Sequence, residues 1–369
     1  MADGYVTVDW GLIEAFVVDA FVGYGVPRED ACICADVLLE ADRRGIESHG
    51  VNRFKPIYID RIVEGVQNPT TEFEIVRQGP TTAVVDGHDG MGQVIGYRAM
   101  NLAIEKAKAY GMGMVAVRNS THYGIAGYYA TMATKAGCVG MTGTNARPSI
   151  APTFGVENML GTNPLTFGLP TDEPFDFVLD CATSITQRGK IETYARKGQP
   201  TPAGMVVNSD GEAATDSVQI LKDLVTGDAA LAPLGGIGEE LAGYKGYGYA
   251  TVVEVLSAAL QGGAYLKMLS GLQDGRKVPY HLGHFFLAVD VSAFTEEAEF
   301  RKTTGDILRA LRDSKKAPGQ NRIYTAGEKE YLVSQERRER GVPIGPSVQK
   351  EILAVRDALG LQYRFPFEG

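Results

Sequence analysis

Apolar residues recur at helical spacing at both ends of the chain. Between residues 9 and 23 they stand three to four positions apart, and the same period returns at 296–312 and 347–359. A second helix is predicted over 27–44, because it starts with proline followed by acidic residues, and Gly45 stands just beyond its end. The pattern therefore predicts helices at both termini.

A third apolar run follows the stretch RRGIESHGVNRF at 43–54. Ser48 is a suitable N-cap for a helix that continues through Ile62. Pro56 conflicts with this prediction, because proline kinks or interrupts a helix, and a start near Lys55 is the alternative. In either case, we expect the first 65 residues to form a small helical unit.

The middle of the chain alternates strand-like runs with helical ones. The pattern predicts strands at 73–78, 82–87, 113–120, 138–146, 160–171, 175–184 and 284–291, helices at 93–111, 123–137, 188–198 and 247–266, a loop-rich section at 201–245, and a loop followed by a charged helix at 326–341. This order predicts one helical lobe made from both termini, residues 1–70 with 295–369. The central residues, 71–294, are predicted to form the other lobe.

Charge and composition restrict the class of protein. The chain has 369 residues, 44% of them hydrophobic, which is enough for a large core, and a formal net charge of −9. Nonspecific binding of nucleic acid needs a basic surface, so this charge argues against a nucleic-acid partner. A small anionic substrate would need a local cationic pocket within this negative field.

The four cysteines and the chain start favour a cytoplasmic protein. Cys32 and Cys34 form C-x-C and not the C-x-x-C of redox or zinc sites, so we expect reduced structural thiols. The N-terminus has no basic and apolar signal segment. The longest apolar stretch, 247–266, contains Glu254 and many small residues, and we interpret it as a packed core helix rather than a membrane span.

A glycine pattern after the strand at 82–87 resembles a dinucleotide-binding fingerprint. Gly90, Gly92 and Gly96 open the next helix, where backbone amides could bind a phosphate. However, the spacing is G-x-G-x-x-x-G, and no acidic residue ends the next strand to bind a ribose. A phosphate site and a plain glycine-rich turn both remain possible.

Three further histidines carry open alternatives. His281 and His284 stand three residues apart and could bind a metal, but no acidic residue or cysteine nearby completes a ligand set. Hydrogen-bonded histidines at the start of a strand are the alternative. His122, in RNSTHYG, lies between a strand and a helix, where ligand sites often occur. It is either functional or a loop histidine bonded to nearby backbone.

The fourth candidate is the pair His49 and Arg53. If Ser48 caps a helix, these residues share one face, which would carry a proton carrier and a carboxylate clamp. The helix N-terminus would favour an anion and lower the histidine pKa. The alternative is a capped surface helix with an incidental histidine and arginine.

Seven stretches together resemble one family over nearly the whole chain. They are ESHGVNRF, NSTHYGIAGYYA, LGTNPLTFGLPT, DCATSITQRGKI, YKGYG, GHFFLAVD and RERGVPIG. They are similar to the type 2 malate/L-lactate dehydrogenases, whose relatives include ureidoglycolate and sulfolactate dehydrogenases. The resemblance implies an α+β fold with a non-Rossmann nicotinamide site on a mostly antiparallel sheet. It also implies a homodimer with its active site near the subunit interface.

The resemblance carries over residue by residue. In the S-H-G-x-x-R motif it assigns proton transfer to His49, with Ser48 beside it, and the substrate carboxylate to Arg53. It assigns His122 to catalysis or cofactor contact and places Thr162 near the substrate. The cofactor positions that it implies, besides His122, are Gly124, Asp180, Ala182, Thr183, Ser184, Lys245, Gly246, Gly327 and Glu328. Ala326 stands where many relatives carry a proline.

The chemistry of these residues suits hydride transfer between NAD or NADP and a 2-hydroxy acid such as malate or lactate. A 2-oxo acid needs its carboxylate bound and its carbonyl oxygen protonated, and Arg53 and His49 can do both. A non-enzymatic NAD(P) sensor and a metal-dependent hydrolase are the alternatives. Malate would need a cation for its second carboxylate, and Arg147 is either that cation or a surface arginine.

Overall fold

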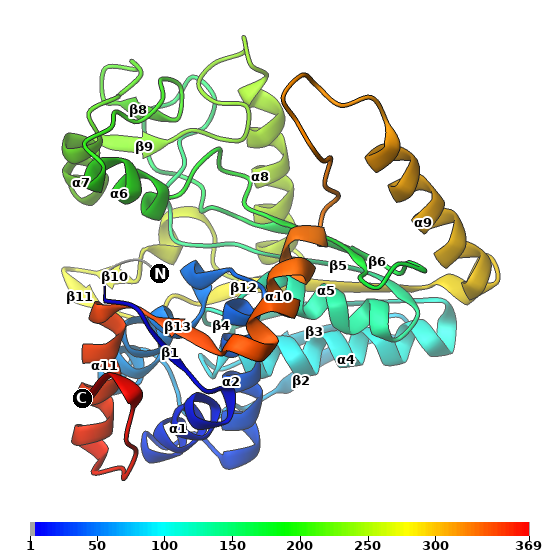
Figure 1. Cartoon of the computed structure of the whole chain (residues 1–369), viewed down its shortest axis with the longest axis horizontal. Coiled ribbons are helices and arrows are strands. Elements are labelled where there is room, and N and C mark those ends of the chain that lie inside the picture. The colour runs from blue at the N-terminus through cyan, green and yellow to red at the C-terminus, as the bar shows by residue number, and fades with distance from the viewer. Residues whose placement is uncertain (1–3, 369) are drawn as a thin grey trace.

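A seven-stranded sheet forms the centre of the computed structural model, which describes residues 4–368 (Figure 1). Its strand order is β2-β3-β4-β12-β5-β6-β7. Neighbouring strands are antiparallel except for β3 and β4. The strands are β2 (Glu74–Gln78), β3 (Thr82–Asp86), β4 (Met112–Ser120), β5 (Cys138–Thr144), β6 (Leu165–Leu169), β7 (Phe177–Cys181) and β12 (Leu282–Asp290). This confirms the expected mostly antiparallel sheet.

Helices cover both faces of this sheet (Figure 1). On one face, α4 (Gly92–Tyr110) and α5 (Ala126–Lys135) pack against inward residues of β3, β4 and β12, such as Phe286. On the other face, α8 (Gly243–Ala258) lies against β12. Burial of apolar side chains on both faces is the main favourable contribution to such a layered arrangement.

The two ends of the chain meet in one apolar cluster. Strand β1 (Val6–Val8) pairs antiparallel with β13 (Val342–Ile344). Helices α1 (Trp10–Gly23), α2 (Arg28–Arg43) and α11 (Pro346–Leu359) contribute to the same buried core. By contrast, α9 (Glu297–Asp313) contacts the central part, where Arg301 donates to the carbonyls of Thr134 and Thr171. The lobe boundaries 1–70 with 295–369 and 71–294 stay a prediction.

The cysteines are free thiols, in agreement with the expectation from C-x-C. Cys34 is fully buried in α2, and burial raises the pKa of its thiol. Such a thiol packs as a small apolar side chain and is a poor nucleophile.

The section 201–245 holds more regular structure than predicted. It contains β8 (Val206–Asn208), α7 (Ser217–Thr226) and β9 (Ala229–Leu231), after α6 (Arg188–Arg196). The side chain of Asp216 caps α7 by accepting from the amides of Val218 and Gln219, and Gly227 ends the helix in the left-handed conformation. The section is otherwise loop-rich as predicted, but the prediction missed α7 although the sequence contained these start and stop signals.

The apolar stretch 247–266 is only partly a packed core helix. Helix α8 ends at Ala258, and the side of it away from the sheet is exposed, with Tyr249 56%, Val252 48% and Val255 51% accessible. The composition indicated an apolar helix but could not show which face the chain itself covers. In the part of the chain that the structure describes, no helix is long and apolar enough to cross a membrane.

The predicted helix capped by Ser48 does not form. Instead, the chain makes two 3₁₀ turns, Glu47–His49 and Val51–Arg53, then a π-helical turn at Phe54–Ile59, and then α3 (Asp60–Val63). Pro56 has no amide hydrogen to bond four residues back, which excludes a regular α-helix through this region. The alternative of a start near Lys55 is therefore closer to the structure.

Candidate functional site

A buried carboxylate anchors the loop that carries Ser48, His49 and Arg53. Asp42, at the end of α2, accepts a hydrogen bond of 2.8 Å from the amide of Val51. Gly50 passes so close that a Cβ there would lie 2.1 Å from Asp42 Oδ1, so only glycine fits. Burial raises the pKa of Asp42 to about 7.

Two histidines that are distant in sequence stack against each other. The ring centroids of His49 and His122 lie 5.7 Å apart, with 19° between the ring planes. His49 comes from the loop after α2, and His122 follows β4. Burial, assisted by the charge of Arg53, lowers the pKa of His49 to about 4. Burial also lowers the pKa of His122, with His49 and nearby arginines contributing. Both imidazoles are therefore neutral at neutral pH.

Hydrogen bonds fix the tautomer of one histidine and leave the other free. His122 Nδ1 accepts from the amide of Gly124 at 3.3 Å and from the hydroxyl of Tyr58 at 2.7 Å, so its proton is on Nε2. His49 Nδ1 lies 2.9 Å from Ser48 Oγ, and this hydroxyl can donate or accept. His49 can therefore adopt either tautomer, which suits a group that gains and loses a proton.

Arg53 lies beside the histidines with most of its guanidinium available. Its Nε donates to the carbonyl of Ser48 at 2.7 Å, and no described carboxylate lies within 4.0 Å of it. The expected shared helix face was wrong, because His49 and Arg53 belong to two separate 3₁₀ turns. Such short turns carry no significant macrodipole. Burial and Arg53 lower the pKa of His49 instead.

A cavity of about 720 Å³ adjoins this loop. It lies between the end of β7, the start of α5 and the residues before α10 (Glu328–Arg340), and it extends to Arg44 and Ile46 just before the histidine loop. Two of the predicted cofactor residues, Asp180 and Gly327, line it, whereas His122 and Gly124 do not. This volume falls within the range of ligand and cofactor sites.

Two acidic residues predicted near the cofactor are engaged within the protein. Asp180 accepts from the amide of Gly127 at 2.7 Å and from the hydroxyl of Thr166 at 3.0 Å, and it thereby caps α5. Glu328 is buried, accepts from the amide of Thr325 at 3.0 Å and pairs with Arg322. These carboxylates stabilise the segments that border the cavity, and Asp180 also lines it.

The remaining predicted cofactor and substrate residues form a second packed group. The amide of Thr183 donates to the carbonyl of Thr162 at 2.9 Å, and the amide of Leu234 donates to Thr183. Gly246 packs so closely on Leu234 that a Cβ would lie 2.2 Å from its carbonyl oxygen. In this group Ala182 is half-buried, Ser184 is buried with an unpartnered hydroxyl, and Lys245 is exposed. Among the described residues, no hydrogen bond joins this group directly to the histidine pair.

The glycines at 90–96 serve close packing. A Cβ at Gly92 would lie 2.4 Å from the carbonyl oxygen of Thr121. The Thr121 hydroxyl accepts from the amide of Gly92 and donates to the carbonyl of Gly90. The start of α4 is therefore fastened to the residue before His122, which agrees with the interpretation as a structural turn.

His281 and His284 form hydrogen bonds with different partners. His284 is fully buried between the hydroxyls of Thr144 and Ser120, at 2.7 and 2.8 Å. His281 Nδ1 lies 2.9 Å from Asp89. These contacts match the interpretation as hydrogen-bonded histidines.

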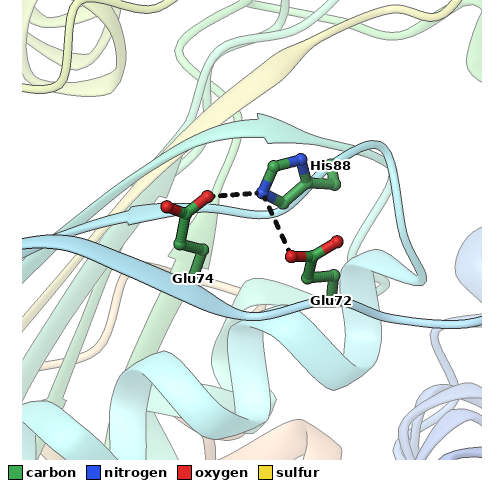
Figure 2. A group of neighbouring side chains, drawn as sticks. All are labelled: Glu72, Glu74 and His88. Atoms are coloured by element: carbon green, nitrogen blue, oxygen red, sulfur yellow. Dashed lines mark hydrogen bonds and ion pairs between the residues drawn. The ribbon is translucent and has the colours of Figure 1, made fainter.

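A separate surface cluster joins Glu72, Glu74 and His88 (Figure 2). His88 Nε2 lies 2.8 Å from Glu74 and 3.9 Å from Glu72. The hydrogen bond that His88 donates to Glu74 raises the pKa of His88. Both glutamates are exposed, so a protonated histidine between two carboxylates accounts for this cluster as an ion pair.

Sequence reasoning missed three residues at the histidine pair. Asp42 anchors the loop, Tyr58 bonds His122, and the guanidinium of Arg61 stands one turn after Tyr58. The signal that could have drawn attention to Asp42 is its place near the end of a predicted helix, eight residues before the glycine of S-H-G. The positions of Tyr58 and Arg61 depend on the π-helical turn, which the hydrophobic pattern does not reveal.

The histidines should titrate in two classes. We expect His49 to stay neutral down to about pH 4, while His88 and His281, whose acidic partners raise their pKa, gain protons above the ordinary histidine value. Histidine-selective ¹⁵N labelling and NMR titration would measure this, because the chain has five histidines. The spectra should also show His122 as the Nε2–H tautomer. Titration of His49 near its usual range, or an Nδ1–H form of His122, would contradict the geometry described above.

Comparison with known proteins gives one consistent result. The model of the malate/L-lactate dehydrogenase family matches residues 8–353. A malate dehydrogenase from Pyrococcus abyssi is 44% identical over 98% of this chain and 97% of its own, and an L-sulfolactate dehydrogenase from Methanocaldococcus jannaschii is 37% identical over 94% and 96%. The crystal structure of malate dehydrogenase from Entamoeba histolytica superposes with a TM-score of 0.93 at 42% identity, covering 97% of this chain and 99% of that one.

Proposed function

Because the chain belongs to the malate/L-lactate dehydrogenase family and is thus an NAD(P)-dependent oxidoreductase of 2-hydroxy acids, we propose that it interconverts malate and oxaloacetate. The observation that carries this proposal is the neutral pair His49 and His122 beside the unpaired guanidinium of Arg53. This arrangement combines a group that can bind a carboxylate with groups that can move a proton to and from the oxygen on the neighbouring carbon.

Each of these three residues has a separate role in this proposal. Arg53 binds the carboxylate next to the reacting carbon through the two terminal nitrogens that Ser48 leaves free. In oxidation, the hydroxyl proton of the substrate passes to Nε2 of His49, and in reduction it returns. His122 donates its Nε2–H to the substrate oxygen, and Tyr58 and Gly124 hold it in that tautomer. The nicotinamide, when bound, accepts or supplies the hydride at the substrate carbon.

The cavity of about 720 Å³ is the proposed cofactor site, and it is not a Rossmann site. Three basic side chains that line it, Lys135, Lys329 and Arg338, have no described carboxylate within 4.0 Å. Unpaired cations of this kind suit the pyrophosphate that NAD and NADP share and the additional phosphate of NADP. The glycines at 90–96 lie elsewhere and are occupied by packing.

Removing cations from this cavity should weaken cofactor binding. We expect Lys135→Gln combined with Arg338→Gln to raise the Kd of the reduced cofactor by about 10-fold or more, because charge-assisted hydrogen bonds to phosphate are lost. Fluorescence titration with NADH and NADPH would measure this, with Lys315→Gln combined with Lys316→Gln, both exposed and outside the cavity, as the charge-matched control. If Ser184→Glu weakens binding and the double variant does not, the cofactor lies along residues 182–184 instead.

The exposed face of α8 supports a homodimer. Tyr249, Val252 and Val255 are exposed there, and an apolar groove of about 490 Å³ runs between this helix, Pro152 and Tyr265. An apolar surface of this extent is typical of a permanent interface. Sedimentation velocity of the purified chain would give the mass of the assembly.

A substrate panel tests the proposed activity. Purified protein is mixed with malate, lactate or sulfolactate and either NAD or NADP, and the absorbance of the reduced nicotinamide is followed. The proposal expects turnover, with malate the preferred substrate. A protein that binds NADH in a fluorescence titration but reduces neither cofactor with any of these acids would instead be a dinucleotide sensor.

A further inference from the structure

Arg61 carries a partly buried charge that the protein does not neutralise. It lies in α3, and the carboxylates on either side of it are engaged elsewhere, because Asp60 pairs with Lys55 and Glu64 with Lys277. Among the described residues, no carboxylate lies within 4.0 Å of the guanidinium of Arg61. Its central carbon lies 4.3 Å from the centre of the Tyr280 ring. The ring offsets only part of the cost of burying this charge.

The position of Tyr280 brings Arg61 to the end of β4, where the histidine pair lies. Strand β12 starts opposite the end of β4, with Leu282 paired with Ser120. Tyr280 precedes Leu282 by two residues and therefore lies near Ser120, at the end of β4. On the other side, Tyr58 lies three residues before Arg61 in the helical segment, and its hydroxyl bonds His122 at 2.7 Å.

A series of short contacts links the segment of Tyr280 with the segment of His122. His281, next to Tyr280, lies 2.9 Å from Asp89, and the carbonyl of the adjacent Gly90 accepts a 2.8 Å hydrogen bond from Thr121. Thr121 directly precedes His122 in the chain. These contacts hold the segment of Tyr280, which packs on Arg61, close to the segment that carries His122.

We propose that Arg61 binds the second anionic group of the substrate, while Arg53 binds the carboxylate beside the reacting carbon. This inference rests on the proposed function and adds the residue that selects a second anionic group on a short 2-hydroxy acid. Both guanidiniums act on the same centre, because each lowers the pKa of His122. A monocarboxylate would leave Arg61 without a counter-ion.

Arg147, the candidate suggested by the sequence, is a poor alternative. It is exposed in the loop after β5, and no described hydrogen bond or ion pair connects it with His49 or His122. An exposed, well-hydrated arginine also discriminates less between substrates than a partly buried one. Arg147 therefore provides a matched control.

The test compares two substrates of equal length, malate and 2-hydroxybutyrate, in which a methyl group replaces the second carboxylate. For Arg61→Gln, we expect the ratio of kcat/KM for malate to that for 2-hydroxybutyrate to fall by about 10–100-fold, the loss for a charge-assisted hydrogen bond, mainly through a higher KM for malate. Arg61→Lys should restore part of the ratio. Arg147→Gln should leave it at the wild-type value.

The outcomes separate this inference from the proposed function. If the wild type turns over 2-hydroxy acids but both Arg61 variants, shown to be folded by circular dichroism, keep the wild-type ratio, Arg61 is not the second anion site and the proposed function stands. A ratio that falls in Arg147→Gln instead would assign the second carboxylate to Arg147. Absence of turnover with every 2-hydroxy acid would overturn the proposed function and this inference together.

Discussion

The variant His49→Ala is expected to turn over malate about 10²–10⁴-fold more slowly than the wild type, the usual scale for removing a general acid–base group. Its imidazole is the one of the pair whose tautomer can change, because its only described hydrogen-bond partner is the hydroxyl of Ser48. We do not expect His122 to replace it, since the amide of Gly124 donates to Nδ1 and leaves the proton on Nε2. Steady-state kinetics with malate would measure the loss.

The matched control is His88→Ala, which removes a partly exposed histidine from the surface cluster. It should keep the wild-type kcat. The Kd of the reduced cofactor should be similar in all three proteins, because His49 acts on the substrate. Near-wild-type turnover in His49→Ala would transfer the proton-carrying role to His122 and leave the loop with a structural role.

Replacing Arg53 by alanine is expected to lower kcat/KM for malate by about 10²–10³-fold. Two charge-assisted hydrogen bonds to the substrate carboxylate would be lost, each worth roughly 1.5–3 kcal/mol, and part of the loss is recovered by water. The effect should lie mostly in KM, since the carboxylate is bound in the ground state and in the transition state. Measurement of kcat and KM separately would show this.

Arg53→Lys makes this experiment specific. Lysine keeps the charge but cannot donate from two terminal nitrogens in one plane, so it should recover only part of the loss. A lysine variant with the activity of the wild type would mean that charge alone is required at this position. An alanine variant with an unchanged KM would show that the carboxylate binds elsewhere.

The regular elements of the sheet and its covering helices could be predicted because their signals are local. Helix α4, for example, follows the apolar period and ends at Gly111 in the left-handed conformation. The strands β2 and β3 flank the predicted Gly-Pro turn. Periodicity and turn residues report on neighbours in sequence, and these elements depend mostly on such neighbours.

The local chemistry of the loop could not be predicted, because it depends on distant segments. Ser48 appeared to be an N-cap, but its hydroxyl faces His49, and Pro56 forces the chain into a wider helical turn. That turn decides which side chains reach His122, and it places Tyr58 beside it. The exposed apolar face of α8 was missed for a similar reason, since periodicity does not tell which partner covers a face.

The histidine pair illustrates the limit of sequence patterns. His49 and His122 were each candidates, but nothing in the spacing of either one predicts that their rings stack. Their contact follows from α2 packing near α4 and from the path of the chain after β4. The resemblance to a known family named both residues, and only the structure gave them different hydrogen-bond partners.

Isotope transfer tests the central claim most directly. The protein is incubated with oxaloacetate and reduced cofactor that carries deuterium at C4 of the nicotinamide, on each face in turn, and the product is analysed by mass spectrometry. The account predicts malate with one deuterium at C2 from one of the two labelled faces, formed about 10²–10⁴-fold more slowly by His49→Ala than by the wild type. Malate without deuterium from either face, or no malate at all while the cofactor binds, would contradict the account.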